Sequence, residues 1–215
     1  MNDSRTPSPA APRPSQSGSL VGAIILAAGA STRMGRPKQL LPIHGQPLLV
    51  RTVEAALAAP VWPVVVVLGA NADLIRPALQ TFPVIIAENP AWAEGMASSI
   101  RTGVATLHQF SRLMNSALLL LCDQPEFSTA AIEKLLAVQR STGASIVAAR
   151  YAGHPGAPAL FDAKHFAALA GLTGEQGARA LLSDPAAPPA LVDLPELAFD
   201  LDTPEDLARL GQPPA

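Results

Sequence analysis

Residues 21–38 read VGAIILAAGASTRMGRPK, and this stretch decides the fold. Its first part, 21–27, is an unbroken apolar run, which is typical of a strand buried on both faces of a parallel sheet. A loop of small residues follows, in a position where open parallel sheets bind ligands and where backbone N–H groups can approach an anion. Arg33 and Lys38 add positive charge that suits a triphosphate. The stretch therefore predicts a strand followed by an anion-binding loop.

The loop matches neither of two common nucleotide-binding motifs. Gly29 and Gly35 are too far apart for a GxGxxG pattern, and the Gly-Lys-Ser/Thr of a Walker A motif is absent. A Rossmann dinucleotide site and a P-loop ATPase are therefore disfavoured. A surface turn with solvated Arg33 and Lys38 is the alternative interpretation of the same residues.

Outward from this loop, apolar runs alternate with helical patterns. Strands are predicted at 21–27, 61–68, 83–87, 116–122 and 144–150, and helices at 47–58, 72–80, 96–109 and 128–140. Repeated strand–helix units favour an α/β fold of three layers. We expect a Rossmann-like, mostly parallel sheet with helices on both faces.

Composition narrows the class of protein. The chain has 215 residues, of which 49% are hydrophobic and 15% charged, with a net charge of −2. Scattered basic residues disfavour a nucleic-acid partner, and no apolar run reaches the roughly 20 residues that span a membrane. A lone Cys122 and the lack of a signal-peptide core favour the cytoplasm. Residues 1–19, rich in Pro and Ser, are predicted to be a disordered tail and 212–215 a second tail, which leaves 20–211 as a single domain.

Several motifs stand in a characteristic order. They are LAAGASTRMGRPK at 26–38, GMASS at 95–99, CDQP at 122–125 and DLDTPEDL at 200–207. Together they resemble the NTP-transferase superfamily and, within it, the MobA-like and molybdopterin cytidylyltransferase family. The resemblance covers Val21 to Leu210. It implies a sheet of the nucleotide-diphospho-sugar transferase type and a nucleotidyltransferase that uses Mg²⁺, with Mn²⁺ as a substitute.

The same resemblance implies roles for individual residues. Catalytic roles fall to Arg33, Lys38, Asp123 and Asp202. The metal would be held by Asp123 and Asp202, with Asp200 as a third ligand or a neighbour of the ligands. The nucleotide-binding residues would be Leu26, Ala27, Ala28, Gly29, Ser31, Arg33, Lys38, Gly95, Ser98, Ser99 and Asp123. The acceptor-binding residues would be His154, Gly156, Pro158 and Arg179.

Other interpretations of these residues stay open at the level of sequence. Asp favours turns, so Asp123 also suits a solvated turn after a strand. Pro204 suits the first position of a helix, so Asp202 or Thr203 also suits its cap. Ser98 and Ser99 stand near a predicted helix start, where they would cap the helix or meet a nucleotide.

Ala28 decides the expected substrate. In the resembling family LAAG accompanies cytosine and LAGG accompanies guanine, so Ala28 favours CTP. The acceptor would be a molybdopterin-type phosphate, the product molybdopterin cytosine dinucleotide, and the partner a molybdoenzyme of the xanthine dehydrogenase type. The alternatives are a GTP-using molybdopterin guanylyltransferase, a sugar- or alditol-phosphate nucleotidyltransferase of the same fold, and a non-catalytic protein that delivers the cofactor.

Overall fold

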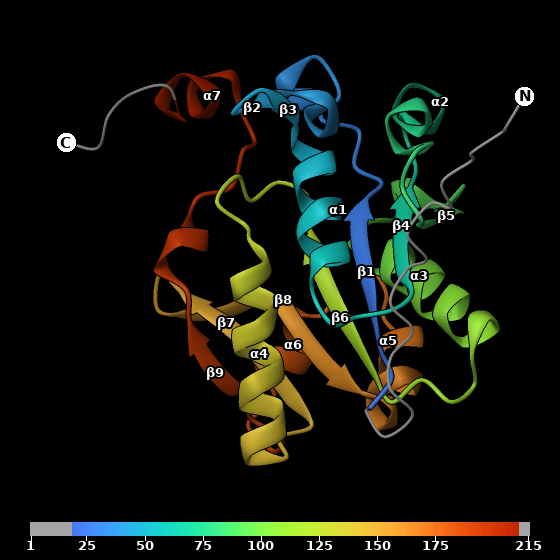
Figure 1. Ribbon diagram of the computed structural model, residues 1–215, viewed down its shortest axis with the longest axis vertical. Helices are drawn as coiled ribbons and strands as arrows, with labels where there is room; N and C mark the ends of the chain where they lie inside the picture. The colour runs from blue at the N-terminus through green and yellow to red at the C-terminus, as the bar shows by residue number, and fades with distance from the viewer. Residues whose placement is uncertain (1–18, 211–215) are drawn as a thin grey trace, which may run out of the picture.

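The computed structural model describes residues 19–210, so both predicted tails, apart from Ser19, lie outside the described residues. Seven strands form one sheet in the order β5-β4-β1-β6-β8-β7-β9 (Figure 1). The strands are β1 (Val21–Ala27), β4 (Val64–Leu68), β5 (Ile85–Glu88), β6 (Ser116–Leu121), β7 (Ile146–Tyr151), β8 (His154–Asp162) and β9 (Ala190–Asp193). A separate two-stranded hairpin joins β2 (Pro42–Ile43) to β3 (Gln46–Pro47).

The sheet is mostly parallel. Central β1 pairs parallel with β4 and β6, β4 pairs parallel with β5, and β7 pairs parallel with β9. Strand β8 runs antiparallel to both of its neighbours, β6 and β7. The predicted α/β class is confirmed, and the carboxyl ends of β1, β4 and β6 meet at one edge of the sheet.

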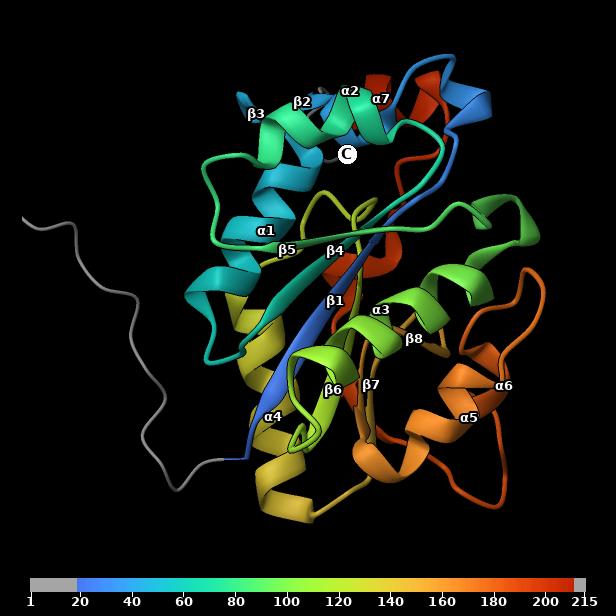
Figure 2. The same cartoon turned by 90° about the vertical axis from the view of Figure 1, so that its right-hand side faces the viewer.

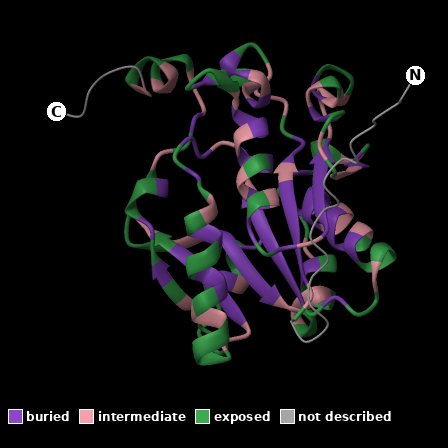
Figure 3. Ribbon diagram, viewed as in Figure 1, coloured by how far each residue is buried: buried purple, intermediate pink, exposed green. Residues whose placement is uncertain are grey.

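Helices cover both faces of the sheet, as Figure 2 shows. The helices are α1 (Leu48–Ala58), α2 (Ala72–Ile75), α3 (Met96–Phe110), α4 (Thr129–Thr142), α5 (Phe166–Ala170), α6 (Arg179–Leu182) and α7 (Pro204–Leu210). Helices α1 and α4 pack on one face and α3 and α5 on the other, whereas α7 packs beyond the sheet on the cluster of Met34 and Leu201. Successive strand residues point to opposite faces, so Ile25 packs with α1 and α4 whereas Ile24 packs with α3. The central strands β1, β4 and β6 are buried on both sides, which explains their unbroken apolar runs (Figure 3).

The structure differs from the expectation in several regions, and the elements that were not predicted include the β2–β3 hairpin, β8, β9, α5 and α6. The segment predicted as one helix at 72–80 divides into α2 and a 3₁₀ turn at Arg76–Leu79, because Pro77 has no N–H to continue α-helical bonding. Strand β8 was not expected, since its two prolines argue against a central strand. Both are accommodated: the pairing with β7 shifts register between Ala148 and Ala149, and β6 pairs with β8 only from Ala159 onward. Among the described residues no helix is long and apolar enough to cross a bilayer.

Candidate active site

The four residues predicted to be catalytic lie together at the carboxyl edge of the sheet. Arg33 and Lys38 belong to the loop after β1, and Asp123 follows β6 by two residues. Strands β1 and β6 are parallel neighbours with Leu26 opposite Leu121, so their following loops start side by side. Asp202 arrives from the segment before α7, far along the chain. The fold therefore gathers two basic and two acidic side chains from three separate segments.

The loop after β1 is shaped by its own polar residues. Ser31 and Gly35 take left-handed backbone conformations, with φ of 55° and 66°. Gln39 is buried, and its amide Nε2 donates to the carbonyls of Ala27 and Gly29, each at 3.0 Å. The Ser31 hydroxyl accepts from the Lys38 backbone N–H at 3.1 Å. Ser31, predicted to bind nucleotide, thus engages its hydroxyl within the loop, and Gln39 is a structural residue that the motif did not single out.

Lys38 lies between the two predicted metal ligands. Its ammonium Nζ donates to Asp123 Oδ2 at 2.8 Å and to Asp202 Oδ1 at 2.7 Å. The second oxygen of Asp202 accepts from Arg33 at 2.9 Å. The Lys38 side chain is 13% exposed, whereas that of Arg33 is 68% exposed. Lys38 is thus the inner cation of the cluster and Arg33 the outer one.

The pKa shifts follow from this arrangement. Burial by itself would lower the pKa of Lys38, but the charge of Asp123 and hydrogen bonds to both carboxylates raise it above its usual range. The hydrogen bond from Lys38 lowers the pKa of Asp202. Loss of hydration raises the pKa of Asp200 to about 6, and the charges of Asp123 and Asp202 add to the rise. At neutral pH the centre therefore holds ionised Lys38 and Asp202 with a third carboxyl group nearby.

The acidic residues fit a divalent metal that is shared with phosphates. Asp123 Oδ1 is buried without a hydrogen-bond partner, so one oxygen of this carboxylate can still bind a cation or accept a hydrogen bond. Among residues 19–210 no three His, Cys, Asp or Glu side chains gather as a complete metal-binding group. Mg²⁺ usually takes one or two carboxylates and completes its shell with water and substrate phosphates. Asp123 and Asp202 satisfy that requirement, and the thiol of neighbouring Cys122 stays protonated because burial raises its pKa to about 12.

The two glycines at the sheet edge, Gly29 and Gly69, have different surroundings. Gly29 is exposed, and a Cβ built on it would meet nothing within 4 Å, so its backbone is open to a ligand. Ala28 is buried, and its Cβ would lie 2.8 Å from a Cβ on Gly69, which also approaches Trp92 at 2.7 Å. Leu26 and Ala27 continue β1 beneath this surface. Gly69 therefore lies close to both Ala28 and Trp92, and the space beside the Ala28 methyl group has no room for a further side chain there.

The second predicted nucleotide segment begins α3. Gly95 is its N-cap residue, with φ of 107°, where a side chain would collide with the Gly174 carbonyl. Ser98 and Ser99 are buried and accept from the Asn89 amide at 2.8 and 3.0 Å. Both hydroxyls are thus engaged inside the protein in this structure. Asn89 is a positioning residue that the sequence pattern did not reveal.

The predicted acceptor residues lie on the hairpin of β7 and β8 and on α6. His154 and Arg179 are exposed, whereas Pro158 is buried. A side chain at Gly156 would collide with the hydroxyl of Tyr151, so glycine allows this close approach. Burial raises the pKa of Tyr151, as do the charges of Asp200 and Asp123, while Arg179 opposes the rise. Tyr151 therefore lies in the combined field of the acidic cluster and the acceptor segment.

Buried Gln124 links the acidic cluster to this hairpin. Its Nε2 donates to the Tyr151 hydroxyl at 3.3 Å and to the carbonyls of Ala157 and Leu197, each at 3.2 Å. Gln124 directly follows Asp123, so these contacts fix the loop that carries the carboxylate. The sequence pattern identified the CDQP motif but not this function of its glutamine.

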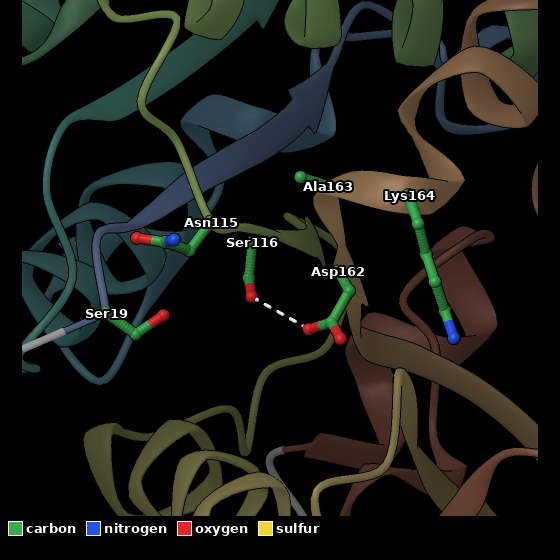
Figure 4. A pocket seen from close by; sticks show the side chains of 6 residues that line it. All are labelled: Ser19, Asn115, Ser116, Asp162, Ala163 and Lys164. Carbon is green, nitrogen blue, oxygen red and sulfur yellow. Dashed lines mark hydrogen bonds between the residues drawn. The ribbon is translucent and has the colours of Figure 1, made fainter.

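A hollow of about 360 Å³ lies elsewhere, at the amino ends of β1 and β6 (Figure 4). Its one carboxylate is already hydrogen-bonded, since Asp162 accepts from Ser116 at 3.2 Å and from Gln139 at 2.7 Å. Ligands of parallel sheets bind at the opposite, carboxyl ends of the strands. The hollow therefore contributes nothing to the site described above.

A basic loop after β1 that faces paired carboxylates, at the carboxyl edge of a mostly parallel sheet, defines a nucleotidyltransferase. The chain belongs to the family of the MobA-like NTP transferase domain, whose model matches residues 23–190.

Individual proteins similar to this chain carry several activities in their names. The chain is 36% identical over 202 residues to nicotine blue oxidoreductase of Paenarthrobacter nicotinovorans, covering 88% of this chain and 96% of that protein. It is 30% identical to 2-C-methyl-D-erythritol 4-phosphate cytidylyltransferase of Xanthomonas euvesicatoria pv. vesicatoria, covering 88% and 83%. The crystal structure of Rv0371C from Mycobacterium tuberculosis H37Rv in complex with manganese superposes with a TM-score of 0.74 at 28% identity, covering 89% and 98%.

Proposed function

We propose that this protein is a magnesium-dependent CTP:molybdopterin cytidylyltransferase, which makes molybdopterin cytosine dinucleotide and releases pyrophosphate. The observation that carries the proposal is the ion cluster of Lys38, Asp123 and Asp202 beside the open backbone of Gly29. Such a cluster suits a metal–triphosphate complex, and the similarity to a cytidylyltransferase supports CTP as the nucleotide.

The chain's own residues act by position and charge. Arg33 and Lys38 bind phosphate oxygens and stabilise the departing pyrophosphate, while Asp123 and Asp202 hold the cation. When bound, Mg²⁺ supplies Lewis-acid stabilisation of charge at the phosphates, and the manganese complex of a similar protein supports a divalent metal here. The acceptor phosphate attacks the α-phosphorus, and the exposed Arg179 and His154 are proposed to hold the acceptor. Catalysis is then mainly orientation and electrostatic stabilisation, without a covalent intermediate on the protein.

The base preference is proposed to depend on Ala28. Ala28 is buried beside Gly69 at the carboxyl ends of β1 and β4, where its methyl group would leave less room than a glycine for the larger guanine. GTP, or a sugar- or alditol-phosphate acceptor, would use the same loop and metal. A molybdoenzyme of the xanthine dehydrogenase type is the proposed recipient of the product. A cytoplasmic location is proposed because the lone Cys122 is a free, buried thiol.

The test is pyrophosphate release with Mg²⁺ and molybdenum-loaded molybdopterin, comparing CTP, GTP, ATP and UTP. Turnover with CTP alone would support the full proposal, and turnover with another NTP would keep the class but replace the base. If none of the four nucleotides gives pyrophosphate, molybdopterin is not the acceptor, and sugar and alditol phosphates are tested next. Because a relative is named as an oxidoreductase, decolourisation of nicotine blue with NADH or NADPH is measured in parallel. Decolourisation without any pyrophosphate release would contradict the proposal.

A further inference from the structure

Lys38 is bound by both carboxylates that the proposed metal site requires. One ammonium group contacts Asp123 Oδ2 at 2.8 Å and Asp202 Oδ1 at 2.7 Å. The two carboxylates come from loops far apart in the sequence, so the structure brings them together around a single cation. The side chain of Lys38 is 13% exposed, which makes this a largely enclosed ion cluster and not a solvated surface pair.

The ammonium and a divalent metal compete for the same place. Mg²⁺ binds carboxylate oxygens at roughly 2.0–2.1 Å, so an ion held by Asp123 and Asp202 would lie within the gap that Lys38 Nζ fills. Two cations cannot share that gap, because their repulsion in a partly desolvated site is strong. Binding of the metal to both carboxylates therefore requires the ammonium to leave.

The ammonium is an incomplete replacement for a metal. It contacts one oxygen of Asp123, while the other oxygen, Oδ1, is buried without a hydrogen-bond partner. A buried unpaired oxygen costs free energy, which a better-coordinating cation would recover. The cluster therefore forms in the free protein, but replacing the ammonium by a metal that also binds Oδ1 would be favourable.

The lysine also has another partner within reach of its loop. Its backbone N–H is fixed by Ser31, but the ammonium is carried on a flexible four-carbon stem. The open backbone of Gly29 belongs to the same loop, so a triphosphate bound there would offer the ammonium a stronger anion than a carboxylate.

We propose that Lys38 reserves the metal site while the protein is free of nucleotide: its ammonium occupies the gap between Asp123 and Asp202, weakens binding of a divalent cation alone, and moves to the triphosphate when metal and nucleotide arrive together. The inference rests on the proposed metal site. Its consequence is that metal and nucleotide bind with positive coupling. The nucleotide draws the ammonium out of the gap that the metal needs, and the metal releases the ammonium to bind the triphosphate.

The first experiment titrates Mn²⁺ alone into nucleotide-free protein and counts free Mn²⁺ by electron paramagnetic resonance. Lys38→Met keeps the length of the side chain and removes its charge. We expect this variant to bind Mn²⁺ about tenfold tighter than the wild type, in the usual range for coupled ligands. The matched control is Lys134→Met, which removes a lysine charge from exposed α4 and should leave Mn²⁺ affinity unchanged. Unchanged or weaker binding by Lys38→Met, or no Mn²⁺ bound by either protein, would overturn the inference.

A second measurement uses the wild type and does not depend on the folding of a variant. The chain contains three lysines, Lys38, Lys134 and Lys164, so ¹⁵N-lysine labelling gives a simple set of ammonium signals. The inference requires the Lys38 signal to stay unchanged with millimolar Mg²⁺ alone and to shift when CTP is added with Mg²⁺. A full shift with Mg²⁺ alone, or none with both, would refute it.

These results are separable from the proposed function. Tighter Mn²⁺ binding by Lys38→Met without any pyrophosphate release by the wild type would keep this inference and remove the cytidylyltransferase activity. Pyrophosphate release by the wild type without the gain in Mn²⁺ affinity would do the reverse.

Discussion

Replacing Gln39 by Leu tests whether one buried side-chain amide stabilises the loop after β1. Gln39 is 1% exposed and donates to the carbonyls of Ala27 and Gly29. Leucine has a similar size but neither a donor nor an acceptor. The substitution therefore removes these two hydrogen bonds and the one that Gln39 Oε1 accepts from the Ser31 hydroxyl at 3.3 Å, with little change in volume. The test therefore isolates the polar contribution of this side chain from its packing.

The magnitude follows from the surroundings of the two carbonyls. The bond to Ala27 is buried, so its carbonyl would stay unpaired at a cost of about 1–3 kcal/mol. The bond to Gly29 is partly buried, and water can replace the donor there, which limits the loss to about 1 kcal/mol. We expect the free energy of unfolding to fall by about 2–4 kcal/mol, which leaves a folded protein with typical total stability of about 5–15 kcal/mol.

Urea unfolding measures this change in stability. Nucleotide binding, measured in the absence of urea, gives its effect on function. Affinity for Mg²⁺–CTP should fall together with stability, because the freed loop no longer presents the Gly29 backbone in one conformation. Gln109→Leu, at the exposed end of α3, is the matched control and should change stability by less than about 0.5 kcal/mol. If Gln39→Leu were as stable as this control, the amide would not support the loop and the argument would fail.

Three further changes probe the rest of the site. Asp123→Asn should lower the rate of pyrophosphate release by at least roughly 10–100-fold, which is the usual loss when a metal site loses a supporting group. The circular dichroism spectrum should stay unchanged. Near-normal turnover at saturating Mg²⁺ would show that Asp123 is not part of the site. Gly69→Ala inserts a methyl group 2.6 Å from the Ala28 carbonyl and should lower the free energy of unfolding by about 1–3 kcal/mol. Gly171→Ala, whose new methyl group would lie 3.4 Å from its nearest atom, should be tolerated. Equal melting temperatures of the two variants would contradict the close packing of Gly69 on Ala28. Ala28→Gly should raise the ratio of kcat/KM for GTP over CTP by roughly tenfold or more, and an unchanged ratio would show that another residue selects the base.

The sequence predicted the first two thirds of the fold well because its elements are long and apolar. The runs at 21–27 and 116–122 became β1 and β6 almost residue for residue, since strands buried on both faces need unbroken apolar sequence. Beyond Tyr151 the helices α5 and α6 and strand β9 are short, and the longer strand β8 contains two prolines, so no regular hydrophobic period distinguishes these elements. Strand β8 forms a hairpin with β7 on one side and pairs non-locally with β6 on the other, which overrides its local preference against strand.

The site was predictable where a motif carries charge, and obscure where polar groups are internal. Arg33, Lys38, Asp123 and Asp202 were expected together, and the structure brings them within hydrogen-bonding reach. The hydroxyls of Ser98 and Ser99 look available in sequence, but their partner Asn89 belongs to a different element. Buried side-chain bonds of this kind join residues through the tertiary fold, so no spacing along the chain announces them.

The placement of Asp202 illustrates how an apolar residue positions a charge that is predicted to be catalytic. Leu201 is fully buried with Met34, which belongs to the nucleotide loop, and its backbone N–H donates to the Asp123 carbonyl at 2.8 Å. The side chains therefore alternate without a regular strand: Leu201 is buried in the core, while Asp200 and Asp202 are exposed or half-buried. A shift of one residue would force a carboxylate into the apolar cluster at a large desolvation cost. Packing of Leu201 thus fixes Asp202 relative to both Asp123 and the loop that carries Lys38.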